Sequence, residues 1–222
     1  MSVALVILVP VLRRPHRVAP LLDSIERASL GARVLFLADP GDRREIVAVE
    51  REQARDFVQV GLDQGGGNYA EKINRGVDLT SEPLLFLGAD DLDFRSGWLE
   101  AALARLADGI GVVGTNDLCN PRVIAGEHST HSLVTREYAA LGTIDEPGKL
   151  LHEGYPHEFV DDEFVETAKF RGAYAHAGDA IVEHLHPMAG KAPTDALYSA
   201  QRRRMCKGRP IYAKRRSLWT SP

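Results

Sequence analysis

The sequence predicts an α/β fold in which a mostly parallel central sheet is flanked by helices. Apolar runs and helical patterns alternate along residues 1–115, an order that is typical of parallel strands joined by crossover helices. The first run, residues 3–9, is almost continuously apolar and rich in β-branched residues, as expected of a strand covered on both faces. The 222 residues, 44% of them hydrophobic, are enough for one domain with a substantial core.

Further elements follow in the same half of the chain. Short apolar runs predict strands at residues 33–38, 57–60, 83–88 and 110–115. Apolar residues spaced three and four apart predict the helices between them. The first such stripe comprises Val18, Leu21, Leu22 and Ile25, and the others lie within residues 44–55, 70–77 and 98–106. The glycine-rich stretch "QGGGN" at 64–68 predicts a loop.

The second half is less regular. We expect a strand or hairpin around 121–135, a short helix near 136–141, a loop over 145–157, a helix at 160–171, a strand at 179–186 and a last helix at about 194–205. This division predicts one domain over residues 1–192, followed by a C-terminal helix and basic tail at 193–222.

Charge is unevenly distributed along the chain. The net charge of −4 gives no sign of nucleic-acid binding by the protein as a whole. Residues 201–216, however, hold eight Lys or Arg and no Asp or Glu, whereas the rest has 19 basic and 31 acidic residues. The basic tail is therefore either a contact for an anionic partner or a solvated extension.

The remaining composition favours a soluble protein of a reducing cytoplasm, of a host cell if the protein is viral. Cys119 and Cys206 have neither metal-binding nor redox spacing. The apolar run at the start predicts a first strand rather than a signal peptide. No stretch approaches the roughly 20 apolar residues that span a bilayer.

An acidic cluster ends the strand predicted at 83–88. The segment "FLGADDLDF" places Asp90, Asp91 and Asp93 directly after it, where ligands bind in open α/β sheets. Such carboxylates repel one another, so we expect a divalent cation, a basic side chain or water beside them. Hard cations such as Mg²⁺ and Mn²⁺ prefer carboxylate oxygens. N-capping of a helix that begins near Ser96 is the alternative.

Two later segments add groups of the same chemistry. His184 and His186 lie two residues apart on a predicted strand, so both face one side and either ligate a metal or serve a structural role. The segment "FVDDEFVETAKFRG" begins a helix with Asp161, Asp162 and Glu163. Acidic residues suit a helix N-terminus, and a positioned carboxylate is also the usual general base for a hydroxyl.

In this order the segments resemble family 2 of the glycosyltransferases, whose fold is called GT-A. The resemblance covers roughly residues 3–187. It begins with "LVPVLRRPHRVAPLLDSI" and "FLADPGD", continues through "GGGNYAEKINRGVDLTSEPLLFLGADDLDFRSGWLE", and ends with the acidic helix and a V-x-H-x-H pattern. It implies a GT-A domain with a nucleotide-binding half at about 1–115 and an acceptor half at about 116–192.

The resemblance also implies a nucleotide-sugar donor, most commonly linked to uridine diphosphate. Asp39 matches the aspartate that contacts the base. The donor-binding residues implied in this way are Pro10, Val11, Arg13, Asp39, Asn68, Lys72, Asn74, Gly88 and Ala89.

A divalent cation, Mn²⁺ or Mg²⁺, is implied as cofactor. Asp90 matches the metal ligand of the family's Asp-x-Asp motif, with Asp91 assisting, whereas Gly88 replaces the first aspartate. His184, together with His186, matches the late metal-binding histidine.

The catalytic base implied for an inverting transfer is Asp161, which lies eleven residues before Gly172. Asp162 is the alternative base, and Glu163 is a candidate to hold the acceptor.

The acceptor and the class of reaction stay open at this stage. Small transferases of this kind occur in phages, where some glycosylate modified bases in DNA, and the basic tail suits such a polyanion. A soluble glycan, a lipid-linked sugar and a protein are the other acceptors. A nucleotidyltransferase on a similar sheet, or a non-catalytic binder of nucleotides or glycans, is the alternative function. "GGGNYA" at 65–70 fits a dinucleotide fingerprint but follows the third predicted strand instead of the first.

Overall fold

The computed structural model describes residues 4–28, 31–53, 55, 58–62 and 68–220. Most of the predicted glycine-rich loop at 64–68 lies outside these residues. Within the described part of the chain no helix is both long and apolar enough to cross a membrane.

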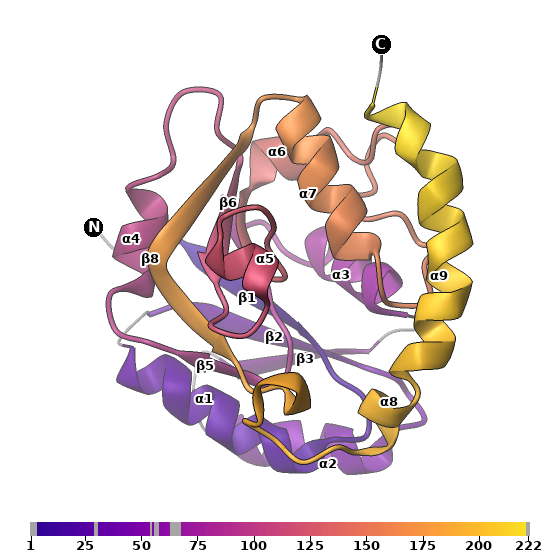
Figure 1. Ribbon diagram of the computed structural model, residues 1–222. Helices are drawn as coiled ribbons and strands as arrows, with labels where there is room; N and C mark the ends of the chain where they lie inside the picture. The colour runs from indigo at the N-terminus through magenta and orange to yellow at the C-terminus, as the bar shows by residue number, and fades with distance from the viewer. Residues whose placement is uncertain (1–3, 29–30, 54, 56–57, 63–67, 221–222) are drawn as a thin grey trace.

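A curved sheet of eight strands forms the centre of the described structure (Figure 1). Its strands are β1 (Leu5–Pro10), β2 (Arg33–Ala38), β3 (Val58–Leu62), β4 (Leu84–Leu87), β5 (Leu92–Phe94), β6 (Val112–Asn116), β7 (Ser132–Thr135) and β8 (Tyr174–His184). They lie in the order β3-β2-β1-β4-β7-β6-β8-β5. β1 to β4 are parallel, as is the β6–β8 pair, whereas β7 and β5 run antiparallel to their neighbours. The predicted mostly parallel sheet is thus confirmed.

Helices cover both faces of this sheet. In chain order they are α1 (Val18–Arg27), α2 (Arg43–Glu52), α3 (Tyr69–Asp78), α4 (Trp98–Leu103), α5 (Pro121–Ile124), α6 (Arg136–Ala140), α7 (Val160–Phe170), α8 (Ala196–Ser199) and α9 (Gln201–Arg215). Ile7 and Val9 of β1 pack with α1, α2 and α4 in one apolar cluster. Val6 and Leu8 point the other way and pack with α3, α6 and α7. This alternation explains the continuous apolar run at the start, because both faces of β1 are buried.

Three predicted elements differ from the structure. The expectation of a strand or hairpin around 121–135 is wrong at its start, where Asn120 caps the short helix α5 and only β7 is a strand. The strand predicted at 179–186 begins earlier, at Tyr174, and ends at His184. A further strand, β5, was not predicted, because three residues with an aspartate in the middle give no strand pattern.

The C-terminal basic segment forms a helix, and most of its basic side chains are exposed. α9 continues to Arg215, ten residues beyond the predicted end, and runs along one side of the molecule (Figure 1). Arg204 pairs with Glu158 at 2.9 Å, and Trp219 is buried. The helix is therefore packed on the domain, although the predicted boundary at residue 192 stays a prediction.

Candidate functional site

Two buried carboxylates follow β4 at the carboxyl end of the parallel strands. Asp90 and Asp91 form the turn between β4 and β5. Gly88 holds this turn against β1, because its N–H donates to Leu8 O at 2.9 Å. A Cβ at this position would lie 3.0 Å from the same oxygen. A residue with a side chain, such as the first aspartate of the family motif, would therefore crowd β1.

The positive charge beside these carboxylates is Arg14, which the sequence analysis did not identify. Its Nη1 lies 3.1 Å from Asp90 Oδ1 and 3.2 Å from Asp91 Oδ2. The side chain of Arg14 is itself buried. Of the three expected neighbours of the acidic cluster, the structure thus has a basic side chain.

The loop after β1 is built to present Arg14. Arg13 has a φ of 54°, a left-handed conformation that is unfavourable for a residue with a side chain. The backbone N–H of Arg13 donates to Asp42 Oδ2 at 2.6 Å, and that of Arg14 donates to Glu45 Oε2 at 2.7 Å. These two carboxylates at the start of α2 hold the strained turn in place.

The C-terminal segment closes over the same guanidinium. Asp195 accepts from Arg14 Nε at 2.7 Å and from Nη2 at 3.2 Å. The ring of Tyr198, on α8, lies 4.0 Å from Arg14 Cζ, a cation–π geometry. The Tyr198 hydroxyl also donates to Asp91 Oδ2 at 2.5 Å. Arg14 and Asp91 therefore tie the segment around α8 to the edge of the sheet.

Three histidines surround the other side of Asp91. His184, at the end of β8, places Nε2 3.4 Å from Asp91 Oδ1. The ring of His186 lies 5.0 Å from that of His184, and its Nδ1 accepts from Met188 N at 3.1 Å. His131 stands edge-on to His184 at 5.4 Å. The structure thus brings the ends of β4 and β8 together, as the predicted shared site requires.

Burial and charge separate the protonation of the two aspartates. Burial, together with the neighbouring Asp91, raises the pKa of Asp90 to about 7. Burial acts in the same direction on Asp91, but His184, Tyr198 and Arg14 outweigh it and lower the pKa of that carboxyl. Burial lowers the pKa of His184, yet Asp91 raises it on balance. Asp91 and His184 therefore favour each other's charged forms, whereas the pKa of Asp90 lies near neutral pH.

The groups at this edge fit a hard divalent cation. Asp90 and Asp91 offer carboxylate oxygens and His184 offers an imidazole nitrogen, all of which bind Mn²⁺. Arg14 at present supplies the positive charge between the two carboxylates. A cation held by these residues would therefore take the position of the guanidinium.

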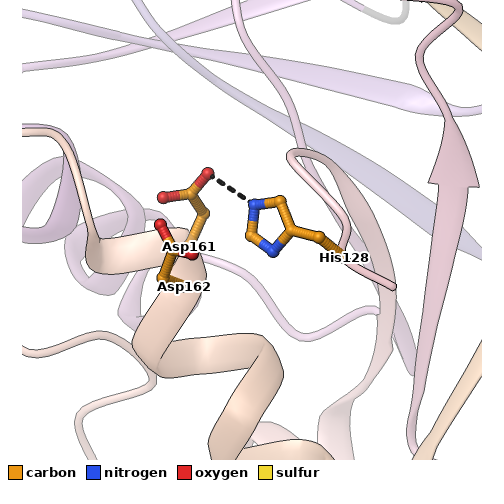
Figure 2. A group of neighbouring side chains, drawn as sticks. All are labelled: His128, Asp161 and Asp162. Atoms are coloured by element: carbon orange, nitrogen blue, oxygen red, sulfur yellow. Dashed lines mark hydrogen bonds and ion pairs between the residues drawn. The ribbon is translucent and has the colours of Figure 1, made fainter. Parts of the chain in front are cut away.

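A second acidic group lies at the start of α7. His128 Nε2 lies 3.1 Å from Asp161 Oδ2, and Arg122 Nη1 lies 2.7 Å from Asp162 Oδ1 (Figure 2). The side chain of Asp161 is 29% exposed, and that of Asp162 is 17% exposed. In the described part of the chain, His128, Asp161 and Asp162 place ligand atoms within 4.8 Å of one another. Each aspartate of this group already has a partner, because Arg122 pairs with Asp162 and His128 contacts Asp161.

Tyr69 connects the two acidic groups. It opens α3, and its hydroxyl donates to Gly88 O at 3.2 Å, two residues before Asp90. Burial raises the pKa of Tyr69, and the charges of Asp161 and Asp91 raise it further. The phenol therefore lies within the electrostatic reach of both carboxylates.

The predicted donor-binding residues divide into two groups. Lys72 Nζ contacts Asp39 Oδ1 at 2.7 Å and donates to Val11 O at 2.8 Å, so these three lie together after β1 and β2. Asn68 caps α3, and the Asn74 amide is hydrogen-bonded to Leu151. These two amides hold α3 against the loop that follows α6.

The remaining predicted residues surround the same edge. Pro10 ends β1, Arg13 is exposed in the turn that follows, and Ala89 packs against the apolar cluster under α1. Arg13 and Ala89 flank the buried Arg14 and Asp90, respectively.

Glu163 points away from this site. Its carboxylate accepts from Tyr155 OH at 2.7 Å and pairs with Arg215 of α9 at 2.8 Å. The structure thus places it in the contact between α7 and α9, not where it would hold an acceptor.

Sequence reasoning missed several residues of the site. They are Arg14, His128, Arg122, His131, Asp195 and Tyr198. His128 and His131 both lie in "GEHSTHS". Because this segment was predicted as part of a strand or hairpin, the two histidines were not recognised as site residues. Asp195 and Tyr198 contact Arg14 from the far end of the chain, and no local pattern marks them.

No family model matches this sequence, and no curated protein matches it. Solved structures are similar to it. Mannosyltransferase PcManGT from Pyrobaculum calidifontis, in complex with GDP-Man and Mn²⁺, superposes with a TM-score of 0.67 at 16% identity, covering 96% of this chain and 64% of that one. The chain therefore spans slightly less than two thirds of that mannosyltransferase.

Two further enzymes show the same likeness. Glucosyl-3-phosphoglycerate synthase from Mycobacterium tuberculosis, in complex with Mn²⁺, UDP-Glc and glycerol 3-phosphate, gives a TM-score of 0.60 at 13% identity, covering 96% of this chain and 80% of that one. S. aureus TarS with UDP gives 0.62 at 14%, covering 81% and 59%. At these identities the likeness shows the fold, and the chain has the GT-A fold that these glycosyltransferases share.

Proposed function

We propose that this protein is a metal-dependent glycosyltransferase that moves a sugar from a nucleoside diphosphate to an acceptor hydroxyl. The observation that carries the proposal is the meeting of Asp90, Asp91 and His184 at the carboxyl edge of a GT-A sheet. This is where such folds bind ligands. The similar structures that hold Mn²⁺ with GDP-Man or UDP-Glc support the same assignment.

Each half of the site has its own task in this proposal. A Mn²⁺ or Mg²⁺ ion would be held by Asp90, Asp91 and His184, with His186 beside them, and would neutralise the diphosphate as it leaves. Asp39, held by Lys72 at 2.7 Å, receives the base of the nucleotide. Gly88 and Tyr69 would form the floor of the site between the donor and the acceptor.

Asp161 is the proposed general base. It is the more exposed of the two aspartates at the start of α7, and Arg122 already pairs with Asp162 at 2.7 Å. Asp161 takes the proton of the acceptor hydroxyl while the oxygen attacks the anomeric carbon and the diphosphate departs. Because attack and departure occur on opposite faces in a single displacement, the configuration at that carbon is inverted.

The acceptor that the surface favours is a polyanion, and we propose a hydroxylated base in DNA. Six basic side chains of the C-terminal helical segment are exposed: Arg202, Arg203, Lys207, Arg209, Lys214 and Arg216. α9 passes beside the start of α7, because Tyr212 stacks on Phe159 at 5.5 Å. Phosphates bound along α9 would therefore lie next to the proposed base.

The first test of this function needs only the donor and a metal ion, and the second adds the acceptor. Thermal-shift screening of nucleotide-sugars should give a rise in Tm with one nucleoside diphosphate, and the rise should require Mn²⁺. Asp161→Asn should keep that shift and lower the transfer rate to hydroxymethylated DNA by about 10²-fold or more. Asp90→Ala should abolish the metal dependence. Transfer by Asp161→Asn at the wild-type rate would refute the assignment of the base.

A further inference from the structure

We propose that His128 is a positioning residue for Asp161, holding one oxygen of its carboxylate so that the other faces the acceptor hydroxyl. This inference rests on the proposed function, because it requires Asp161 to be the base. It assigns a role to a histidine that lies 33 residues before its partner and on a different element.

The contact joins a buried histidine to a partly exposed aspartate. The side chain of His128 is only 2% exposed, whereas that of Asp161 is 29% exposed. His128 Nε2 and Asp161 Oδ2 are 3.1 Å apart and point toward each other (Figure 2). One carboxylate oxygen is therefore engaged from the protein interior, and the carboxylate still has access to solvent for a substrate.

The segment around α5 serves both aspartates at once. Arg122, on α5, pairs with Asp162 at 2.7 Å, and His128 follows six residues later in the loop before β7. Arg122 thus keeps Asp162 from acting as the general base, whereas His128 leaves Asp161 able to do so. A guanidinium stays charged at every physiological pH, but an imidazole can lose its proton. The two aspartates are consequently given different counter-groups.

The second ring nitrogen indicates which form of His128 suits the site. Among the described residues, Nδ1 of His128 is buried and has no hydrogen-bond partner. A charged imidazolium would leave a buried N–H without an acceptor there, which is unfavourable. The neutral ring with its proton on Nε2 avoids this and still donates to Asp161. We therefore assign this neutral tautomer to the active state.

Protonation of His128 should in turn weaken the base. Burial lowers the pKa of His128, but the hydrogen bond and the charge of Asp161 raise it on balance. An imidazolium beside Asp161 lowers the pKa of that carboxyl and reduces its affinity for the acceptor proton. The rate of transfer should hence rise with pH as His128 loses its proton. The midpoint of this rise should lie above the ordinary histidine pKa of 6.5.

Other titratable and charged groups around the pair come from four elements: Asp162 of α7, Arg122 of α5, His157 before α7, Tyr69 of α3 and Tyr212 of α9. Burial lowers the pKa of His157 and raises that of both tyrosines, which moves all three away from neutral pH. Asp162 has a raised pKa through burial and through Asp161, so Asp162→Asn is the necessary control.

The first test of the His128–Asp161 pair requires no enzymatic turnover. Imidazole resonances of the full-length protein are titrated by NMR, with His128 assigned by its loss in His128→Gln. Asp161→Asn should lower the pKa of His128, because it removes the carboxylate charge. An unchanged pKa would overturn the proposal. Loss of the His128 titration on adding Mg²⁺ alone would instead mark this cluster as a cation site and would also overturn it.

Kinetics then separate positioning from mere packing. Gln can place an amide N–H where His128 Nε2 lies, so His128→Gln should retain transfer while its acid limb moves to lower pH. His128→Leu should lower kcat at least about tenfold with the donor KM unchanged. Leu matching the wild type, or a Gln variant with an unshifted limb, would overturn the proposal. A wild-type protein that turns over no donor would refute the proposed function, whereas the NMR titration would still decide whether the pair exists.

Discussion

At the scale of single residues, the two adjacent aspartates after β4 have opposite effects on stability. Asp90 has a pKa raised to about 7 by burial and by Asp91, whereas the pKa of Asp91 is lowered by His184, Tyr198 and Arg14 against the effect of burial. An acid with a raised pKa loses stability as pH rises above its unfolded value. An acid with a lowered pKa gains stability in the same direction.

We therefore expect Asp90→Asn to stabilise the metal-free protein and Asp91→Asn to destabilise it. The gain from Asp90→Asn should grow as the pH rises from about 4 to about 7 and then stay constant, because the buried carboxyl becomes charged over this range. Urea unfolding in the presence of a chelator measures both variants across this range. Two variants with effects of the same sign would contradict the assigned protonation states. Saturating Mn²⁺ should remove the advantage of Asp90→Asn, because the ion requires the carboxylate.

At the scale of elements, strands buried on both faces could be predicted from the sequence. β2 has the predicted bounds because every position after Arg33 is buried and apolar. β5 could not be predicted, since its strand character comes from pairing with β8 and not from its own three residues. The strand or hairpin expected around 121–135 was wrong at α5, where Asn120 and Pro121 are good signals for a helix start.

The same distinction holds for the site. Asp91 and His184 were expected to meet because the resemblance to family 2 of the glycosyltransferases assigns both to one metal site, and they lie 3.4 Å apart. Arg14 was not expected, because its partner Asp195 lies 181 residues later in the chain. Local patterns place groups on elements, but contacts between distant segments follow only from how those segments pack.

The segment around α8 should oppose metal binding through Arg14. A cation between Asp90 and Asp91 must displace a guanidinium that Asp195 and Tyr198 hold in place. Repulsion between like charges about 4 Å apart is worth several kcal/mol near a protein surface. We therefore expect Arg14→Met to bind Mn²⁺ at least about tenfold more tightly than the wild type in calorimetry without donor.

A matched control for this effect is available on α1. Arg27→Met removes an exposed arginine that pairs with Asp93 at 2.8 Å. Asp93 is close in sequence to the metal site but is not part of it. Its affinity for Mn²⁺ should equal that of the wild type. Asp195→Asn should fall between the two, because it loosens Arg14 without removing its charge. Weaker Mn²⁺ binding by Arg14→Met would mean that the guanidinium supports the metal site instead of occupying it.

At the scale of the whole molecule, the basic helix α9 lies on the side of the sheet that also carries α3 and α7. The chain has a net charge of −4, yet residues 201–216 hold eight basic residues. α9 packs through Ile211 and Tyr212 on the cluster that contains α3 and α7. α2, which also has exposed arginines, belongs to the opposite cluster. A polyanion attracted to α9 would thus arrive on the side that holds Asp161.

This arrangement predicts which surface would set the affinity for the proposed DNA acceptor. Arg203, Lys207 and Lys214 lie four and seven residues apart, so they share one exposed face of α9. Replacing all three by Gln should weaken DNA binding at least about tenfold at physiological salt and reduce the slope of log K against log salt by roughly one to three. The same change at Arg43, Arg44 and Arg51 of α2 removes three exposed charges elsewhere and should leave the slope within about one of the wild type. Equal losses in both triple variants would show that net charge, and not the face of α9, governs the interaction. Unfolding temperatures should stay near the wild-type value in both, because exposed side chains away from buried partners contribute little to stability.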